Sequence, residues 1–506
     1  MSRPSSPLDH VTPYDRFAWS DSQIEQLLAT GQHERELIAY FGETEYRQLA
    51  ALARQAAQTA LESAPRAVIV PGIMGSQLGL RRAAPLPNDI LWLDPIDIEL
   101  GRLSLLRVPG SARAPAAVNA PTAGPTTVDV PAAGPAQVVS LGAVLFSYLR
   151  LKLHLRVAGF DAIIHDYDWR LGIDELGRAL ATRLGAELAA GTASNRAIVV
   201  VAHSMGGLVT RAALTQPGLE RIGRVVLMGT PNFGSYAPVQ ALRGTYAVVR
   251  KIARLVKNHS AESMAAEIFN TFPCLYDMLP VASRHGGPDL FDPSEWPTAG
   301  PRPQPQMLAS AQSVAKLLAR PDPRFAVIVG VNQETVTAIT RRNNDFIYTV
   351  TRHGDGTVPA VSAELPGATN YYAAAAHSDL TRDPEVAAAV IDLLRTGTTA
   401  RLSRSRKGKS RAEARISDRQ LRRTHAQKVD WASLEPEDRR LFLQNLNEPP
   451  QLRLRVPGTG RTTSPTAPDA MLAQRRPAKG ANARTRSAHK PSSAPHPRAP
   501  RRPKAK

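Results

Sequence analysis

The chain has 506 residues, of which 63 are lysine or arginine and 44 are aspartate or glutamate, so its formal net charge is +19. The surplus is confined to one end, because residues 401–506 hold 27 basic and 8 acidic side chains whereas residues 1–400 hold 36 of each. The neutral body therefore gives no indication of a polyanionic partner. A single cysteine, Cys274, excludes an internal disulfide and a thiolate metal cluster.

The N-terminal region is predicted to be helical and to lack a targeting signal. Its first residues, MSRPSSPLDHVTPYDRF, contain no apolar stretch of the kind that a secretory signal peptide needs. No apolar run in the chain reaches the ~18 residues typical of a membrane span. We therefore expect a cytoplasmic protein by default, with export by a signal-independent route left open. Ser20 and Gln23 form a capping-box pattern that opens helical spacing, so residues 1–63 are predicted to be an N-terminal extension of two or three short helices.

The central part of the chain alternates between strand and helix patterns. Short apolar runs, mostly β-branched, occupy residues 67–71, 162–164, 197–202, 225–228, 325–329 and 371–373. Helical spacing occupies residues 143–158, 174–189, 206–215 and 384–395. Runs of this kind are typical of strands buried on both faces of a parallel sheet. Residues 64–398 are therefore predicted to form one α/β domain, a mostly parallel sheet with helices on both faces.

Two insertions and a tail depart from this alternation. A lid insertion is expected at about 95–140, where residues 111–135 hold five prolines and only two charges and are predicted to be an extended loop. A cap insertion is expected at about 236–322, because short helical patterns alternate there with proline-rich loops. Residues 399–506 are expected to be a basic, mostly disordered tail, in which 429–446 is the one segment able to form a helix.

The most informative segment is Val199–Gly207, with the sequence VVVAHSMGG. A strand, a sharp turn at Ser204 and a helix form the pattern of a nucleophile elbow, with Ala202 in place of the usual first glycine. The turn needs small residues two before and two after the serine, and Ala202 and Gly206 meet that requirement. Ser204 is therefore the candidate nucleophile. The alternative is a strand–turn–helix unit with an incidental serine.

A serine nucleophile needs a base and an acid, which follow it in the chain order of α/β-hydrolases. His377 follows the last strand pattern and is the candidate base; its alternative is a surface loop histidine. Asp355 lies between two glycines that allow a tight turn around its carboxylate, which makes it the candidate acid. An ordinary Asp-Gly hairpin turn is the alternative for Asp355.

The oxyanion hole requires two N–H donors. Met205, directly after the serine, is expected to supply one of them. The glycine-containing loop after the first strand is expected to supply the other, from Met74. No glycine-rich segment matches a phosphate-binding loop, and no metal-ligand pattern is found, so we expect no cofactor and no metal.

Together these motifs resemble those of the lecithin:cholesterol acyltransferase and lysosomal phospholipase A2 family of α/β-hydrolases. The resemblance covers about 67–395 and is carried by Pro71-Gly-Ile-Met-Gly-Ser-Gln-Leu78, Tyr167-Asp-Trp-Arg170, Ala202-His-Ser-Met-Gly-Gly207, Gly229-Thr-Pro231, Gly354-Asp-Gly-Thr-Val358 and His377. It implies the α/β-hydrolase fold, a triad of Ser204, Asp355 and His377, and an oxyanion pair of Met74 and Met205. It also implies acyl-ester lipid substrates and a lid and cap that face a membrane.

Several residues fall outside the triad. The secreted members carry a lid disulfide, which this chain cannot form with one cysteine. Asp168 and Arg170 are interpreted as an ion pair that braces the floor of the site. Trp92 and Asp94 are candidate substrate-binding residues of an acyl pocket, although a core role for Trp92 stays open.

The leading hypothesis is a serine-dependent lipid acyl hydrolase or O-acyltransferase that acts on phospholipid or related acyl esters through an acyl-enzyme. The expected partners are an acyl lipid and, peripherally, a membrane surface. One alternative is a generic carboxylesterase or lipase. Another is a binding protein on a hydrolase scaffold, whose basic tail contacts anionic lipid or nucleic acid through charge and without specificity.

Overall fold

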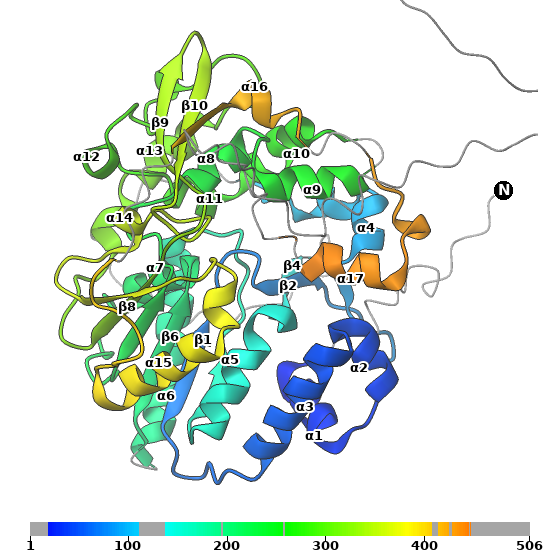
Figure 1. Ribbon diagram of the computed structural model, residues 1–506, viewed down its shortest axis with the longest axis vertical. Helices are drawn as coiled ribbons and strands as arrows, with labels where there is room; N and C mark the ends of the chain where they lie inside the picture. Colours follow the sequence, from blue (N-terminus) through cyan, green and yellow to red (C-terminus); the bar gives the residue numbers. More distant parts are fainter. Residues whose placement is uncertain are drawn as a thin grey trace, which may run out of the picture. The chain divides into compact units, whose positions relative to one another are not determined.

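The computed structural model describes residues 19–110, 137–193, 196–256, 259–406, 413–424, 428–444 and 446. Its centre is a six-stranded sheet with the order β11–β8–β7–β6–β1–β5, in which every neighbouring pair is parallel (Figure 1). The strands are β1 (Arg66–Val70), β5 (Asp161–Ile164), β6 (Ile198–His203), β7 (Val225–Met228), β8 (Phe325–Gly330) and β11 (Thr369–Ala373). Each of the six apolar runs in the sequence forms one of these strands.

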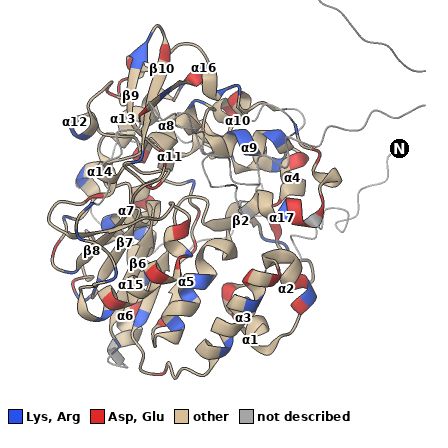
Figure 2. Cartoon of the chain, viewed as in Figure 1, with Lys and Arg blue, Asp and Glu red and all other residues tan. Residues whose placement is uncertain are grey.

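Helices cover both faces of this sheet. The helices α5 (Leu145–Val157) and α15 (Pro384–Thr396) pack against each other on one face, and α6 (Ile173–Ala193) and α7 (Met205–Ala213) contact each other on the opposite face (Figure 1). Charged residues are absent from β6, β7, β8 and β11 and lie on the surrounding helices (Figure 2). The predicted α/β class, with helices on both faces of a parallel sheet, is confirmed.

The N-terminal helices α1 (Asp21–Thr30), α2 (Glu34–Phe41) and α3 (Glu43–Ala57) pack on the outer side of α5. Ser20 caps α1 in the predicted capping box. Leu145, Leu149 and Leu153 of α5 share a buried apolar cluster with these helices. Beside that cluster Lys152, whose side chain is 1% exposed, forms ion pairs of 2.9 Å with Asp21 and with Glu25. The extension is thus joined to the sheet domain by apolar and ionic contacts.

A second, antiparallel sheet flanks the lid insertion that was expected at about 95–140. It has the order β3–β2–β4 and consists of β2 (Ser76–Leu80), β3 (Asp89–Trp92) and β4 (Val138–Ala143). The helix α4 (Pro95–Glu99) and the 3₁₀ helix η3 (Arg102–Leu106) follow β3. The proline-rich loop predicted for 111–135 lies outside the described residues.

Residues 236–322 form short helices and loops above the carboxyl edge of the sheet. The helices are α8 (Tyr236–Leu242), α9 (Ala247–Leu255), α10 (Ala261–Glu267), η4 (Phe269–Thr271), α11 (Pro273–Asp277), α12 (Ala282–His285), η5 (Pro293–Glu295), α13 (Pro305–Ala311) and η6 (Val314–Leu317). Beyond β8, the chain forms the hairpin β9 (Thr335–Arg342) and β10 (Asp345–Thr351), then α14 (Ala360–Ala363) and, after β11, η7 (Asp379–Thr381). Among the described residues no helix is long and apolar enough to cross a bilayer.

The boundary predicted at 398 is too early, because part of the expected tail belongs to the fold. The elements there are β12 (Ala414–Ser417), α16 (Asp418–Leu421), η8 (Trp431–Ser433) and α17 (Pro436–Gln444). β12 adds an antiparallel strand to β10. Asp418, which is fully buried, accepts hydrogen bonds from Arg243 of the cap (2.8 Å) and from the Tyr348 hydroxyl (2.7 Å). The prediction of disorder rested on the average composition of residues 399–506, in which the few apolar residues of this short folded segment carry little weight. Residues 447–506 lie outside the described part of the chain.

The Lys152 ion pairs lead to a prediction about stability. Replacing both acidic partners, Asp21→Asn with Glu25→Gln, leaves a buried ammonium group without a counter-ion, and we expect the free energy of unfolding to fall by ~3–5 kcal/mol. Urea denaturation followed by circular dichroism measures the change. Adding Lys152→Met should recover most of the loss, whereas Glu43→Gln, which breaks an exposed pair with Arg47, should change little. A double variant with the stability of the parent protein would contradict this prediction.

Candidate active site

Ser204 lies in a strained turn at the carboxyl end of β6. Its backbone has φ 54° and ψ −128°, outside the regions that L-residues ordinarily occupy, and α7 begins at the next residue. Two residues later, a Cβ added to Gly206 would lie 2.3 Å from the carbonyl oxygen of Pro71. The turn is therefore pressed against the loop that follows β1, which explains the requirement for a small residue at that position.

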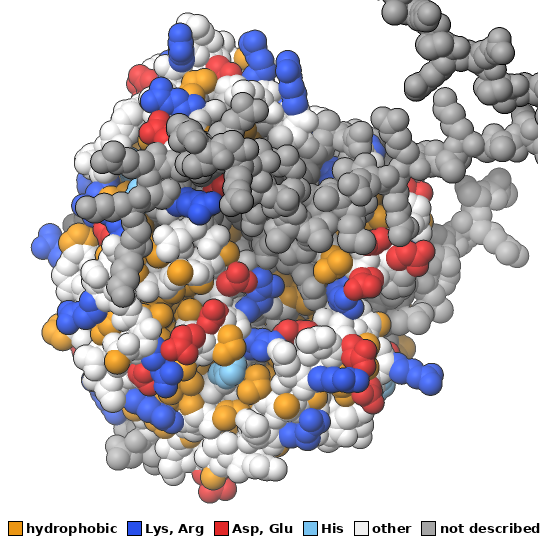
Figure 3. All heavy atoms as spheres, viewed as in Figure 1, with side chains coloured by type: hydrophobic (Ala, Val, Ile, Leu, Met, Phe, Trp, Pro, Cys, Tyr) orange, Lys and Arg blue, Asp and Glu red, His pale blue; other side chains and the backbone are white. Residues whose placement is uncertain are grey.

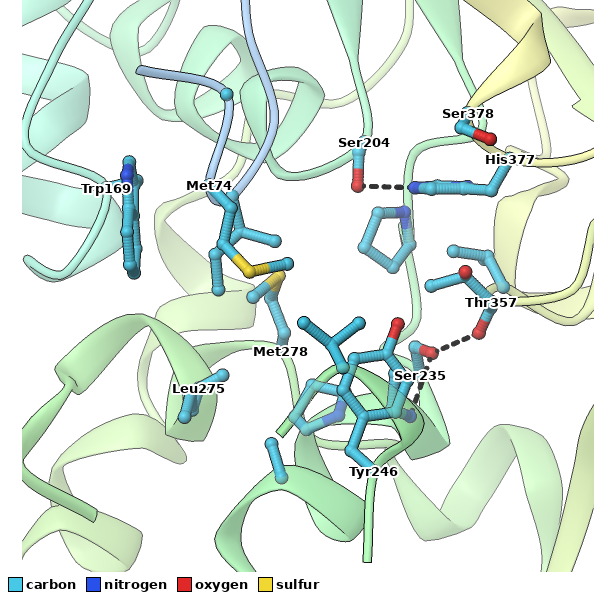
Figure 4. Close-up of a pocket in the computed structure, with 18 of the residues that line it drawn as sticks. Met74, Trp169, Ser204, Ser235, Tyr246, Leu275, Met278, Thr357, His377 and Ser378 are labelled. Carbon is cyan, nitrogen blue, oxygen red and sulfur yellow. Dashed lines mark hydrogen bonds between the residues drawn. The ribbon is translucent and has the colours of Figure 1, made fainter. Parts of the chain in front are cut away.

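His377 lies in the loop between β11 and η7 and faces the serine. Its Nε2 is 2.8 Å from Ser204 Oγ (Figure 4). Its Nδ1 is 2.7 Å from Asp355 Oδ2. The Asp355 side chain is 1% exposed, and its other oxygen accepts hydrogen bonds from the N–H groups of Thr357 (3.0 Å) and Val358 (2.7 Å). Both oxygens of the buried Asp355 carboxylate thus have hydrogen-bond partners. The structure brings the three predicted side chains together in one hydrogen-bonded chain.

Asp355 reaches the site by an indirect route. The β9–β10 hairpin separates it from β8 in sequence, but a Cβ added to Gly330, the last residue of β8, would lie 2.5 Å from the Asp355 Cβ. The acid therefore packs on the end of β8, as expected for a residue that follows a strand of the sheet. The hairpin itself turns at Asn343 and Asn344, which both have positive φ, so Asp355 is not its turn residue.

The loop after β1 places Met74 beside the nucleophile. A Cβ added to Gly72 would come within 2.8 Å of the Ser204 Cβ, so backbone and nucleophile are in direct contact there. Met74 has φ 60°, and its carbonyl accepts a hydrogen bond from the Trp92 indole (3.3 Å). Met205 opens α7, where the N–H groups of a first helical turn point away from the helix. Both expected oxyanion donors therefore belong to segments that border Ser204.

An apolar cavity lies between this edge of the sheet and the cap. Leu275 and Met278 lie across it from Ser204 and His377 (Figure 4). The apolar side chains that line it are Ile73, Met74, Trp92, Trp169, Val248, Val249, Ile252, Phe269, Phe272, Leu275 and Met278. Such a lining with few polar groups is typical of a pocket for an apolar ligand. Most of these residues come from the cap, where the helical spacing of Val248, Val249 and Ile252 was the available signal for side chains that face inward.

Of the two tentative substrate-binding residues, only Trp92 lines the cavity. Its ring packs edge-on against Trp169, with 5.5 Å between the ring centres. The prediction for Asp94 is wrong. Asp94 is fully buried and caps α4, where its Oδ1 accepts hydrogen bonds from the N–H groups of Ile96 (2.8 Å) and Asp97 (3.4 Å). Its proximity to Trp92 in sequence reflects the start of a helix and not a shared pocket.

The ion pair predicted for the floor of the site is present. Arg170 and Asp168 are joined by hydrogen bonds of 2.5 and 2.8 Å, and Arg170 Nη1 also donates to the carbonyl of Leu106 (2.7 Å). The pair thus ties η3 to the loop after β5. The residue before Asp168, Tyr167, donates a hydrogen bond to the carbonyl of Pro71 and so supports the loop that carries Met74.

Tyr148 and His203 also line the cavity, and the sequence did not single them out. Both are buried, and their polar atoms are hydrogen-bonded to each other. The position of His203 next to the serine was the one available signal. The part of the chain that the structure describes holds no cluster of three or more histidine, cysteine or acidic side chains placed to bind a metal ion.

The chain has distant likenesses to solved structures. The chain resembles the crystal structure of the Tle4–Tli4 complex with a TM-score of 0.41 and 14% identity, over 65% of this chain and 98% of that one. The mature form of lipase BlEst2 from Bacillus licheniformis gives a TM-score of 0.32 and 14% identity, over 67% of this chain and 93% of that one. Likenesses this distant carry no argument about activity. No curated protein matches the chain significantly.

The family comparison is more direct. A model of the lecithin:cholesterol acyltransferase family matches residues 157–429, which is more than half of the chain and includes Ser204, Asp355 and His377. The chain therefore belongs to the lecithin:cholesterol acyltransferase family of α/β-hydrolases, serine enzymes that hydrolyse or transfer the acyl groups of lipids.

Proposed function

We propose that the protein hydrolyses or transfers acyl groups of ester lipids, phospholipid or a related lipid, through a covalent acyl-enzyme on Ser204. The observation that carries the proposal is the hydrogen-bonded chain from Ser204 Oγ through His377 to Asp355, with links of 2.8 and 2.7 Å, at the mouth of an apolar cavity. A serine hydroxyl with a base in hydrogen-bond reach, and an acid behind that base, is the arrangement that activates a serine nucleophile.

The reaction follows from this arrangement. Ser204 Oγ attacks the ester carbonyl while His377 Nε2 takes the hydroxyl proton, and Asp355 stabilises the imidazolium that forms. The N–H groups of Met205 and Met74 face the developing oxyanion, and the N-terminus of α7 adds a favourable dipole. His377 then gives the proton to the leaving alcohol as the C–O bond breaks. Water or an acceptor alcohol repeats these steps on the acyl-enzyme, which releases an acid or a new ester.

The cavity supports a lipid acyl chain as the substrate group. Tyr246, Val248, Val249 and Ile252, at helical spacing in the cap sequence, all line it. The cap therefore presents an apolar surface to the acyl chain of an ester whose carbonyl lies at Ser204. On the face shown in Figure 3, basic and acidic side chains are interspersed, which gives no support to a scaffold specialised for binding polyanions.

The triad assignment predicts the behaviour of two variants. A fluorophosphonate probe should label the protein at Ser204, and Ser204→Ala should abolish both labelling and ester hydrolysis. We expect Asp355→Asn to lower kcat by ~10⁴ with the fold retained, because the amide cannot hold the histidine tautomer or balance its charge. Asp379→Asn changes a half-exposed acid of the same loop region that pairs with Arg382, and this control should keep full activity. Near-full activity of Asp355→Asn together with loss in Asp379→Asn would show that the acid is misassigned.

The cavity predicts selectivity for acyl length. Leu275→Trp fills the part of the cavity that lies across from Ser204, so the specificity constant for a palmitoyl ester should fall by ~10-fold or more, because each excluded methylene weakens transition-state binding. The rate with a butyryl ester should change little, and the volume-conserving Leu275→Met should change neither. Parallel assays with the two 4-nitrophenyl esters measure the difference. If the parent protein cleaves only short soluble esters and releases no fatty acid from phospholipid vesicles of any composition, it is a generic carboxylesterase.

A further inference from the structure

A buried hydrogen-bonded chain connects the loop after β1 to the loop that carries His377. The Gly72 N–H is 2.8 Å from the Tyr148 hydroxyl oxygen, which is 3.0 Å from His203 Nδ1. His203 Nε2 is in turn 3.0 Å from the carbonyl oxygen of His377. The four residues come from the loop after β1, α5, the end of β6 and the loop after β11. This series of hydrogen bonds therefore passes next to Ser204, which follows His203 and contacts Gly72.

The donor and the acceptor in each of these three hydrogen bonds can be assigned when the His203 ring is neutral. The carbonyl oxygen of His377 can only accept, so His203 Nε2 carries a proton and donates it. His203 Nδ1 of the neutral ring is then an acceptor, and the Tyr148 hydroxyl donates to it. The same hydroxyl oxygen accepts from the Gly72 N–H. No polar atom in the chain is left unsatisfied, and reversing any one link would leave two acceptors or two donors facing each other.

The His203 ring stays neutral while the triad works. The pKa of His203 is lowered to about 3, mainly by burial and in addition by the neighbouring His377, and the hydrogen bond to the His377 carbonyl opposes this lowering only in part. The ring centres of the two histidines are 4.8 Å apart. A positive charge on His203 would oppose the imidazolium that His377 must form, and its neutrality removes that conflict.

We propose that His203 is a positioning residue, which together with Tyr148 sets the His377 loop and the Met74 loop at fixed distances from Ser204. The inference rests on the proposed function, since it assigns His203 a task in that same site. Its physical basis is that a general base and an oxyanion donor act only within a fraction of an ångström of the reacting atoms, and a displacement of ~1 Å can cost ~100-fold in rate.

The decisive experiment compares His203→Phe with His203→Gln. Phenylalanine keeps the ring volume but cannot donate to the His377 carbonyl, so we expect kcat for 4-nitrophenyl butyrate to fall by ~10–100-fold with KM little changed. Glutamine can donate its amide N–H to that carbonyl and accept from Tyr148, so it should recover most of the rate. A residue that only fills the core would show neither the kcat-specific loss nor the rescue.

Two controls separate positioning from general damage. His154→Phe changes a half-buried histidine of α5 whose Nε2 has no partner among the described residues, and it should leave kcat unchanged. Tyr148→Phe should lower kcat, whereas Tyr236→Phe, which removes a buried hydroxyl that likewise lacks a partner in the described part of the chain, should not. Thermal unfolding of each variant checks that it is folded.

Each outcome decides the question. A folded His203→Phe protein with the parent kcat overturns the inference, and so does a rate for His203→Gln no better than that for His203→Phe. If His203→Phe does not fold, an unchanged kcat in Tyr148→Phe overturns the inference and a kcat-specific loss there supports it. Retention of activity by Ser204→Ala would instead defeat the proposed function itself, which makes the two failures distinguishable.

Discussion

The carboxyl ends of β1, β6, β8 and β11 lie at one edge of a single parallel sheet, and every group in the proposed mechanism depends on that alignment. Each strand delivers one part of the site: the Met74 loop, Ser204, Asp355 and His377. Because parallel neighbours keep their ends level, Ser204 and His377, which are 173 positions apart in the chain, meet within hydrogen-bond distance. The strained conformation of Ser204 persists only because the loop after β1 packs directly against it.

The sequence predicted the parts of the fold that have strong local signals. Continuous apolar runs predicted all six strands of the central sheet. The signal is strongest for β1, β6, β7 and β8, whose residues are buried on both faces and are almost all apolar. The strands of the two antiparallel sheets were not predicted, since polar residues interrupt the apolar pattern in β2 and β9, and β2 also contains a glycine. His203 escaped for another reason. Its hydrogen-bond partners come from two distant segments, α5 and the loop after β11, and no local spacing signals a contact that only the assembled sheet creates.

Buried charge plays a similar part at both ends of the chain. Lys152 attaches α1 to the sheet domain, and Arg243 attaches α16 to the cap, where it also donates to the carbonyls of Pro297, Ala299 and Pro301. Pairs of this kind add less stability than apolar contacts of equal size, but they penalise every alternative docking in which a charge is left without its partner. They specify where the terminal segments lie, while the apolar clusters supply the free energy.

The late position of Asp418 has a consequence for the order in which the molecule is made. Asp418 follows its partner Arg243 by 175 residues, so at ~5–20 residues per second the ribosome leaves the arginine without its carboxylate for roughly 9 to 35 s. Every residue that lines the apolar cavity has been made before then, because the lining ends at Thr381. During biosynthesis one of the last interior contacts of the cap to form is therefore an ionic one, and until α16 has emerged the cap contains an arginine whose buried position has no counter-ion.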